Sequence, residues 1–208
     1  MDTLTKIMNA AVELFRRYGF KTITMDDVAR HAGVSKKTLY QHFANKQEVI
    51  NESVTWYKNH LFELCQQIFD SSGNAIEAMV GLMSLMEQTF RQMNPIAMME
   101  LQRYYPEGHQ RFRETLLTQD VEVIRKNIER GIEEGLYREE INADLMAKIY
   151  IETSVSLCMS PVLLNDRYDL HVVNNELMEH FLYGLMTPKG IKLYTKYKKT
   201  YLKQVVKI

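Results

Sequence analysis

Apolar residues recur at helical spacing along almost the whole of the 208-residue chain. Near the start they fall at every third or fourth position, which places them on one face of an α-helix. No convincing alternation of apolar and polar residues indicates a β-strand. The pattern therefore predicts an all-α protein. The first apolar stripe consists of Leu4, Ile7, Met8, Ala11, Leu14, Phe15 and Tyr18.

Two short helices are predicted after this first one. Gly19 is placed to end the first helix, as glycine often does just past a helix. Thr24, with Asp27 three residues later, resembles a capping box that opens a second helix. Ser35 is placed to cap a third helix, from about 36 to 43.

Longer helices are predicted beyond this point. Asn45 with Glu48 three residues later is a further cap signal. Breaks rich in Pro, Gly and Asn then separate the helical stretches. The predicted ranges are 46–70, 75–93, 96–105, 109–134, 142–160 and 175–187.

The formal net charge of zero hides an uneven distribution along the chain. Residues 1–50 carry a balance of +3, with 8 Lys and Arg against 5 Asp and Glu. Residues 51–187 carry −10, and residues 188–208 carry +7 with seven lysines and no acid. A neutral protein of this kind can still present a basic face to an anionic partner.

The lysine-rich end is predicted to form one more helix packed on the body of the protein. Its apolar residues keep a roughly helical spacing while its lysines form a solvated face. A second nucleic-acid contact and a disordered tail are the alternatives. The spaced apolar residues are Ile191, Tyr194, Tyr201 and Val205.

Composition indicates a globular protein, with 46% hydrophobic and 25% charged residues. The N-terminus lacks the features of a secretory signal, and no apolar run has the length of a membrane span. We therefore expect a cytoplasmic protein that does not contact a membrane. Cys65 and Cys158 are interpreted as buried free thiols, with a disulfide or redox pair as the minor alternative.

The two short helices and the turn "AGVS" between them have the lengths of a helix-turn-helix. In this motif the second helix enters the major groove of DNA. The apolar stripe of the first helix can be met by Val28, Ala29, Val34, Leu39 and Phe43, which leaves the polar residues from Lys36 to His42 outside. Lysines attract phosphate oxygens, and a glutamine amide can read the edge of adenine. A merely solvated helix face is the alternative.

Residues 10–50 resemble the N-terminal DNA-binding domain of the tetracycline-repressor (TetR) family. The resemblance is in register over about 45 residues, and Lys37 departs from it because a small residue is frequent there. It rests on Ala11, Leu14, Phe15, Gly19-Phe20, Thr24, Val28-Ala29, Ala32-Gly33-Val34-Ser35, Leu39-Tyr40, His42-Phe43 and Lys46.

The resemblance implies roles for particular residues. Thr24 and Lys46 would contact phosphate, while Tyr40 and His42 would touch backbone or base methyl groups. Gln41 is our candidate for sequence readout. The full predicted DNA-binding set is Thr24, Ser35, Lys36, Lys37, Thr38, Tyr40, Gln41, His42 and Lys46.

The resemblance also implies a larger helical domain that dimerises and holds a small-molecule effector, so we expect a DNA-binding domain at 1–47 and an effector domain at 48–208. Residues 130–150, "RGIEEGLYREEINADLMAKIY", resemble the end of the seventh helix and the start of the eighth helix in this family. Two later helices combine apolar and small residues in a way that permits close packing between subunits. Packing within their own subunit is the alternative. The predicted dimer residues are Leu145, Ile149, Leu157, Leu177, Phe181, Leu182 and Leu185.

A cluster of methionine and aromatic residues in the middle of the chain is the candidate effector site. Flexible thioethers suit irregular apolar cavities, although plain core is the alternative. Glu100, Arg103, His109 and Arg113 could orient a ligand or simply solvate the surface. The predicted ligand-binding residues are Phe90, Met93, Met98, Met99, Tyr104, Tyr105, Phe112, Leu116 and Met159.

The sequence thus predicts a homodimeric repressor that is released from a palindromic operator on double-stranded DNA by an apolar or aromatic effector. A DNA-binding regulator without an effector, controlled by a protein partner or by abundance, is the alternative. An enzyme is disfavoured because motifs such as GxSxG, HExxH and the phosphate-binding loop are absent. No catalytic residue, cofactor or metal site is predicted.

Overall fold

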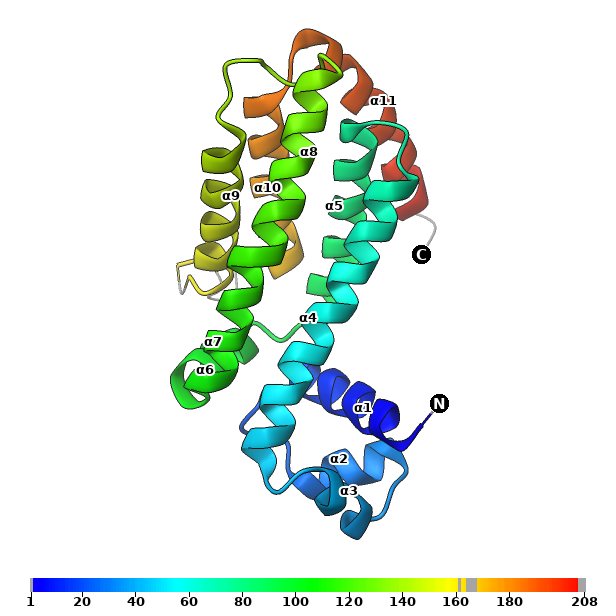
Figure 1. Cartoon of the computed structure of the whole chain (residues 1–208), viewed down its shortest axis with the longest axis vertical. Coiled ribbons are helices and arrows are strands. Elements are labelled where there is room, and N and C mark those ends of the chain that lie inside the picture. Colours follow the sequence, from blue (N-terminus) through cyan, green and yellow to red (C-terminus); the bar gives the residue numbers. More distant parts are fainter. Residues whose placement is uncertain (1, 161, 164–167, 206–208) are drawn as a thin grey trace. The chain divides into compact units, whose positions relative to one another are not determined.

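The structure is a computed structural model that describes residues 2–160, 162–163 and 168–205, with side chains as far as residue 199. Within these ranges the secondary structure is helical, as predicted (Figure 1). The described residues hold one isolated antiparallel bridge, between Tyr137 and Met186. None of their helices is long and apolar enough to cross a membrane.

The chain divides into two compact units. Unit 1 comprises residues 1–61 and 92–115, and unit 2 comprises residues 62–91 and 116–208. The functional boundary after residue 47 stays a prediction.

Unit 1 begins with the three predicted short helices. Asp2 caps the first of them by accepting a 2.7 Å hydrogen bond from the Thr5 backbone N–H. Asn45 caps the long fourth helix, since its side chain accepts from the Glu48 backbone N–H at 3.0 Å. The helices with residues in unit 1 are α1 (Thr3–Tyr18), α2 (Met25–Ala32), α3 (Lys36–His42), α4 (Lys46–Ser71, as far as residue 61), α6 (Ile96–Tyr104) and α7 (Pro106–Thr115).

Unit 2 contains the last turns of α4 and most of the longer helices. In Figure 1, α9 and α10 lie side by side and run in opposite directions. The complete helices of unit 2 are α5 (Ala75–Arg91), the π-helix η1 (Leu116–Asp120), α8 (Val121–Glu133), α9 (Ala143–Cys158), α10 (Leu170–Leu185) and α11 (Pro188–Val205).

Two helices differ from the sequence prediction. The helix expected over 109–134 is instead a longer helical run, α7–η1–α8, that is wound as a π-helix in the middle. The helix expected to start at 175 begins at Leu170, whose side chain is buried.

The predicted helix in the lysine-rich end is confirmed as α11, which packs on α5. Tyr194 is its buried anchor, and the Tyr197 hydroxyl accepts a 3.0 Å hydrogen bond from Asn74. The side chains of Tyr201 and Val205 lie outside the described residues.

A buried polar network joins α5, α8 and the segment after α8. Tyr137 donates to Asn127 Oδ1 at 3.1 Å, and Asn127 Nδ2 donates to the Ala75 carbonyl at 3.0 Å. The Tyr137 ring lies directly against Gly131, where a Cβ atom would come within 2.0 Å of Tyr137 Cδ2. A side chain at position 131 would therefore disrupt this part of unit 2.

Candidate DNA-binding surface

The turn between α2 and α3 depends on Gly33. Gly33 has φ 67° and ψ 33°, in the left-handed region that favours glycine. Its N–H and that of Val34 satisfy carbonyl groups at the end of α2, including a 3.0 Å bond from Val34 to Ala29. Glycine therefore ends α2 and redirects the chain into α3.

The inner side of α3 is anchored in the core of unit 1. Leu39 and Phe43 are almost fully buried, as are Val28 and Ala29 on α2. This is the division of faces that the apolar pattern predicts. Because both anchors lie on one side of the helix, the opposite side is held toward solvent.

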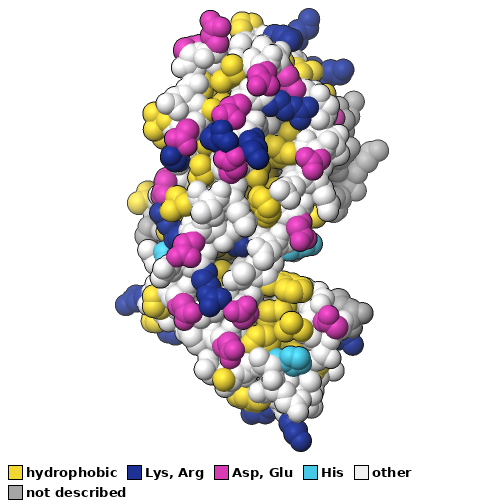
Figure 2. All heavy atoms as spheres, in the orientation of Figure 1, with side chains coloured by type: hydrophobic (Ala, Val, Ile, Leu, Met, Phe, Trp, Pro, Cys, Tyr) yellow, Lys and Arg dark blue, Asp and Glu magenta, His cyan; other side chains and the backbone are white. Residues whose placement is uncertain are grey.

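Four predicted DNA-binding residues lie on that outer side. Lys37, Tyr40, Gln41 and His42 are all exposed, and Tyr40 keeps 46% of its surface. In Figure 2, Lys and Arg side chains lie at the lower edge of the view, where Figure 1 draws α3. A cation, an aromatic hydroxyl and an amide on one exposed helix face suit phosphate contact and base readout.

Lys36 is already paired in the free protein. Its ammonium group lies 2.7 Å from a carboxylate oxygen of Asp26 on α2, and the hydrogen bond to Asp26 raises the pKa of Lys36. Both side chains are well exposed, so the pair contributes little to stability. Lys36 would have to leave or share this partner to bind a phosphate.

Three other predicted residues are engaged in helix caps or in a turn contact. Ser35 Oγ accepts from the Thr38 backbone N–H at 3.0 Å and lies 2.8 Å from Thr38 Oγ1. Thr24 Oγ1 accepts from the Asp27 N–H at 3.2 Å and lies 2.6 Å from Asp27 Oδ2, to which it donates. The hydroxyl proton of Thr24 is thus committed to the capping box rather than free for a phosphate.

Lys46 is also held within unit 1. Its ammonium group donates to the Lys21 carbonyl at 3.3 Å, and burial lowers the pKa of Lys46 against the opposing influence of Glu100 and Asp27. A phosphate contact by Lys46 would therefore form beside an existing internal contact.

Glu100 contributes to the geometry of this domain in a way that the sequence analysis missed. Its Oε2 accepts the backbone N–H groups of Phe20 at 2.7 Å and Lys21 at 3.0 Å. Gly19 has φ 82°, and a Cβ atom added there would lie only 2.7 Å from this carboxylate. Glycine avoids that contact. The sequence analysis considered Glu100 as a ligand-orienting group, whereas the structure places it on the turn between α1 and α2.

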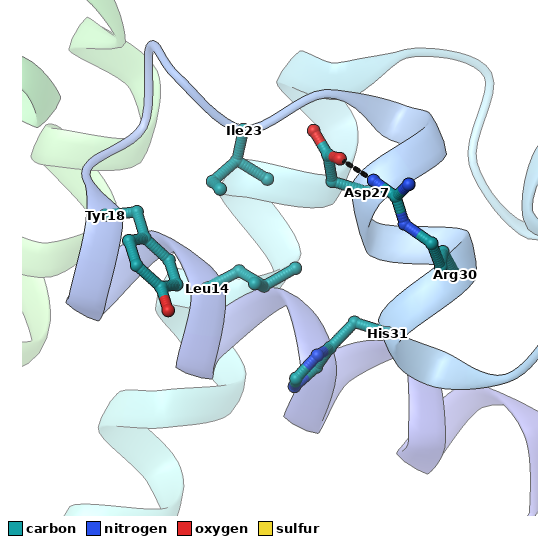
Figure 3. Close-up of a pocket in the computed structure, with 6 residues that line it drawn as sticks. All are labelled: Leu14, Tyr18, Ile23, Asp27, Arg30 and His31. Carbon is teal, nitrogen blue, oxygen red and sulfur yellow. Dashed lines mark hydrogen bonds and ion pairs between the residues drawn. The ribbon is translucent and has the colours of Figure 1, made fainter.

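Figure 3 shows an open pocket of about 590 Å³ on α1 and α2 of the same unit. Its polar residues are engaged in contacts within the domain: Asp27 pairs with Arg30, and His31 lies 3.0 Å from Glu13. No residue of α3 lines it. The pocket is therefore separate from the outer face of α3, and its apolar lining consists of Leu14, Tyr18 and Ile23.

The predicted ligand-binding residues are divided between the two units. Tyr104 and Tyr105 contact the turn after α1: the Lys21 ammonium lies 4.5 Å from the Tyr104 ring centre, and the Tyr105 and Phe20 ring centres are 5.8 Å apart. A ligand role for the whole set stays a prediction. Unit 1 holds Met93, Met98, Met99, Tyr104, Tyr105 and Phe112, and unit 2 holds Phe90, Leu116 and Met159.

The predicted dimer residues fall into three groups by exposure. Leu145 and Ile149 on α9 are 53% and 46% exposed, and are available to a partner. Phe181, Leu182 and Leu185 on α10 are buried within the single chain, and a role for them at a subunit interface stays a prediction. The remaining predicted residues, Leu157 and Leu177, are half-buried.

The sequence profile described as "Bacterial regulatory proteins, tetR family" matches residues 7–52, which contain most of α1 and the whole of α2 and α3. The chain belongs to the TetR family. It is a DNA-binding transcriptional regulator with an N-terminal helix-turn-helix.

The sequence similarity of this TetR-family regulator to its relatives extends beyond the DNA-binding domain. It is 26% identical over 152 residues to the HTH-type transcriptional repressor KstR2 of Mycobacterium tuberculosis, covering 72% of this chain and 76% of that protein. It is 28% identical over 161 residues to the uncharacterised HTH-type transcriptional regulator YhgD of Bacillus subtilis, covering 73% and 82%. The solved structure of FadR from Bacillus subtilis in complex with stearoyl-CoA is similar in fold, with a TM-score of 0.66, 20% identity and coverage of 87% and 98%.

Proposed function

We propose that this regulator is a homodimeric repressor that acts in the cytoplasm, binds a two-fold symmetric operator and is released by a mostly apolar small molecule. The observation that carries the proposal is the outer face of α3. Lys37, Tyr40 and Gln41 are exposed there, on a helix fixed from behind by Leu39 and Phe43. A rigid helix with such a face fits the major groove.

Dimerisation follows from how such motifs read DNA. One short helix contacts few base pairs, and paired half-sites are read by two-fold symmetric dimers. Leu145 and Ile149 lie one turn apart on α9 and leave an exposed apolar stripe. Ser156, further along the same helix, is a small exposed residue that permits close approach. We therefore propose that α9 contributes to the subunit interface.

An acyl-CoA is the first effector class to test. FadR of Bacillus subtilis, which shares the fold, was solved with stearoyl-CoA. The chain also carries 13 methionines, whose flexible side chains adapt to long apolar ligands. A ligand releases DNA if it binds the released conformation better than the DNA-bound one. A coupling of about 1–3 kcal/mol changes operator affinity roughly 5- to 150-fold.

The test begins with the DNA. Binding of the purified protein to fragmented genomic DNA should enrich short, discrete and near-palindromic sites. Affinity for such a site is then measured with and without stearoyl-CoA, with free CoA as the control. Weaker binding with stearoyl-CoA alone supports the proposal. Enrichment of all DNA without preference would overturn specific binding.

The dimer is tested on the same operator. Ile149→Asp should shift the protein toward monomers in analytical ultracentrifugation and weaken operator binding. Ile191→Asp, at an exposed apolar residue of α11, is the matched control and should leave both unchanged. If a specific operator is found but no apolar compound affects its binding, the regulator without an effector becomes the better description.

A further inference from the structure

The first turns of α2 and α3 are joined by the ion pair between Asp26 and Lys36. The Lys36 ammonium lies 2.7 Å from Asp26 Oδ1 and donates a hydrogen bond to Asp26 Oδ2 at 3.1 Å, so it contacts both oxygens of the carboxylate. The two residues are ten positions apart, on either side of the turn between the helices. In the free protein, a positive charge at the start of the recognition helix thus has a counterion from the same chain.

Asp26 is the acid of the helix-turn-helix that contacts α3. Residues 24–46 contain two acidic residues, Asp26 and Asp27. Asp27 is committed within the start of α2, where its Oδ2 accepts from the Thr24 N–H at 3.0 Å and from the Thr24 hydroxyl at 2.6 Å. Figure 3 shows that its other oxygen pairs with Arg30 of the same helix. The Asp26 carboxylate instead spans from α2 to Lys36.

The pair lies where a DNA phosphate would have to arrive. The side chains of Lys36 and Asp26 are 60% and 62% exposed, so a large partner can reach both. Lys36 adjoins Lys37 and lies one turn before Tyr40, two residues of the exposed outer face. A phosphate oxygen in contact with the Lys36 ammonium would come close to Asp26, because that nitrogen already touches the carboxylate.

Both ways of binding that phosphate cost free energy. If Lys36 keeps Asp26 and also holds the phosphate, two anions lie close together and repel each other. If Lys36 leaves Asp26, the ion pair is lost and an exposed carboxylate remains beside the DNA. Each route makes the Lys36 contact with DNA weaker than the contact of a lysine without such a partner.

The pair also affects the salt dependence of binding. A lysine that neutralises a phosphate releases a cation from the DNA, and this release makes affinity fall as salt rises. A carboxylate that loses its lysine attracts a cation from the solution. The two effects oppose each other, so Lys36 adds little to the salt dependence while Asp26 is charged.

We infer that Asp26 is an internal counterion of Lys36 that competes with DNA phosphate and lowers the affinity of the regulator for DNA. The inference rests on the proposed function, since it concerns the DNA contact of α3. Phosphates are the same in every sequence, so Asp26 lowers the affinity for the operator and for other DNA alike.

The experiment measures binding of the full chain to a fluorescent duplex of random sequence over a series of NaCl concentrations. Asp26→Asn should bind roughly 2- to 5-fold more tightly, a range set by the strength of an exposed ion pair. The slope of log affinity against log salt should become steeper by roughly one phosphate contact. Asp70→Asn, at an exposed residue of α4 in unit 2, removes the same charge and should bind like the original chain.

A double-mutant cycle with Lys36→Gln separates competition for Lys36 from the mere loss of a negative charge. If Asp26 acts by holding Lys36, Asp26→Asn should tighten binding more when Lys36 is present than when Gln replaces it. If Asp26 only repels the DNA, it should tighten binding equally in both backgrounds, and this result would overturn the inference. Unchanged affinity of Asp26→Asn, or an equal gain in Asp70→Asn, would overturn it as well.

Thermal unfolding checks that the variants remain folded. Asp26 and Lys36 are exposed, so their substitution should change the free energy of unfolding by no more than about 0.5 kcal/mol. If Asp26→Asn does not fold, Asp26→Ser is measured in its place with Asp70→Ser as its control.

The same measurements distinguish this inference from the proposed function. If the original chain prefers a selected operator but Asp26→Asn binds no more tightly, the proposed function stands and the counterion role fails. If the original chain binds all duplexes without preference and Asp26→Asn still binds them more tightly through Lys36, the counterion role stands and specific repression fails.

Discussion

Lys37 and Gln41 lie one turn apart on the same face of α3, but their side chains suit different tasks. The Lys37 ammonium is a point charge that can hold a phosphate of any sequence, and it stands where a small residue is frequent in the family. The Gln41 amide presents a donor and an acceptor together, which matches the edge of adenine in the major groove. Contacts to phosphate position a protein, whereas contacts to bases specify its site.

Substitution at these two positions should therefore have different effects. Lys37→Ala should weaken binding to all sequences similarly and reduce the slope of log affinity against log salt by roughly one phosphate contact. Gln41→Ala should relax the preference at one base pair and cost about 1–3 kcal/mol on the best site. Lys126→Ala, at an exposed lysine of unit 2, is the control. Equal effects of the Lys37 and Gln41 variants on all sequences would refute this division of roles.

His109 on α7 predicts a pH dependence of stability. Its Nε2 is buried without a hydrogen-bond partner among the described residues, and burial, with a smaller influence of Arg113, lowers its pKa. The unfolded chain therefore takes up the proton at a higher pH than the folded chain does. Stability is fully present above the ordinary histidine pKa of about 6.5 and is lost as pH falls through the lower folded-state value.

Urea unfolding at pH 7.5 and 5.5 tests this sign. His109→Gln cannot titrate, so it should lose less stability on acidification than the original chain. His60→Gln, at an exposed histidine of α4, is the matched control. An equal loss in the His109 variant would show that this histidine does not contribute.

At the scale of elements, the Glu100 side chain helps to attach α6 to the DNA-binding helices. Glu100 accepts two backbone N–H groups from the turn that leads into α2, and charge-assisted bonds of this kind are among the stronger ones. Glu100→Ala should lower the free energy of unfolding of the chain by about 1.5–3 kcal/mol. Gln102→Ala, at an exposed residue of the same helix, should change it by less than about 0.5 kcal/mol. Equal effects would contradict the role given to Glu100.

Two helical glycines should respond in opposite directions. A Cβ at Gly131 would overlap the Tyr137 ring, so Gly131→Ala should destabilise the chain by about 1–3 kcal/mol or more. Gly184 on α10 has open space around its Cβ position and no positive φ, so Gly184→Ala should be neutral or stabilising by up to about 1 kcal/mol. Thermal unfolding of the two variants provides the comparison.

The sequence predicts local features of these elements better than contacts between them. The capping box at Thr24 and the glycine turn at Gly33 depend on neighbouring residues, and both are confirmed. The π-helix after α7 and the contact of Glu100 with Phe20, eighty residues away, have no local signal. Helical spacing also cannot tell a core face from an interface: Leu182, a predicted interface residue, is fully buried within the single chain.

At the scale of the whole molecule, a repressor of the proposed kind uses two copies of α3 together. Each chain carries one helix-turn-helix, and the exposed stripe of Leu145 and Ile149 on α9 offers a surface by which two chains could associate. Two-fold symmetry of the protein must then appear in its DNA site. The separation of the half-sites reports the separation of the two recognition helices.

The most direct test is selection of binding sites from random DNA duplexes by the purified protein, followed by sequencing. We expect one enriched inverted repeat with half-site centres about one helical turn apart or somewhat more. Selection with Gln41→Ala should return the same repeat with one base position in each half relaxed. An unenriched pool, or a single asymmetric half-site, would contradict the claim that paired α3 helices read DNA.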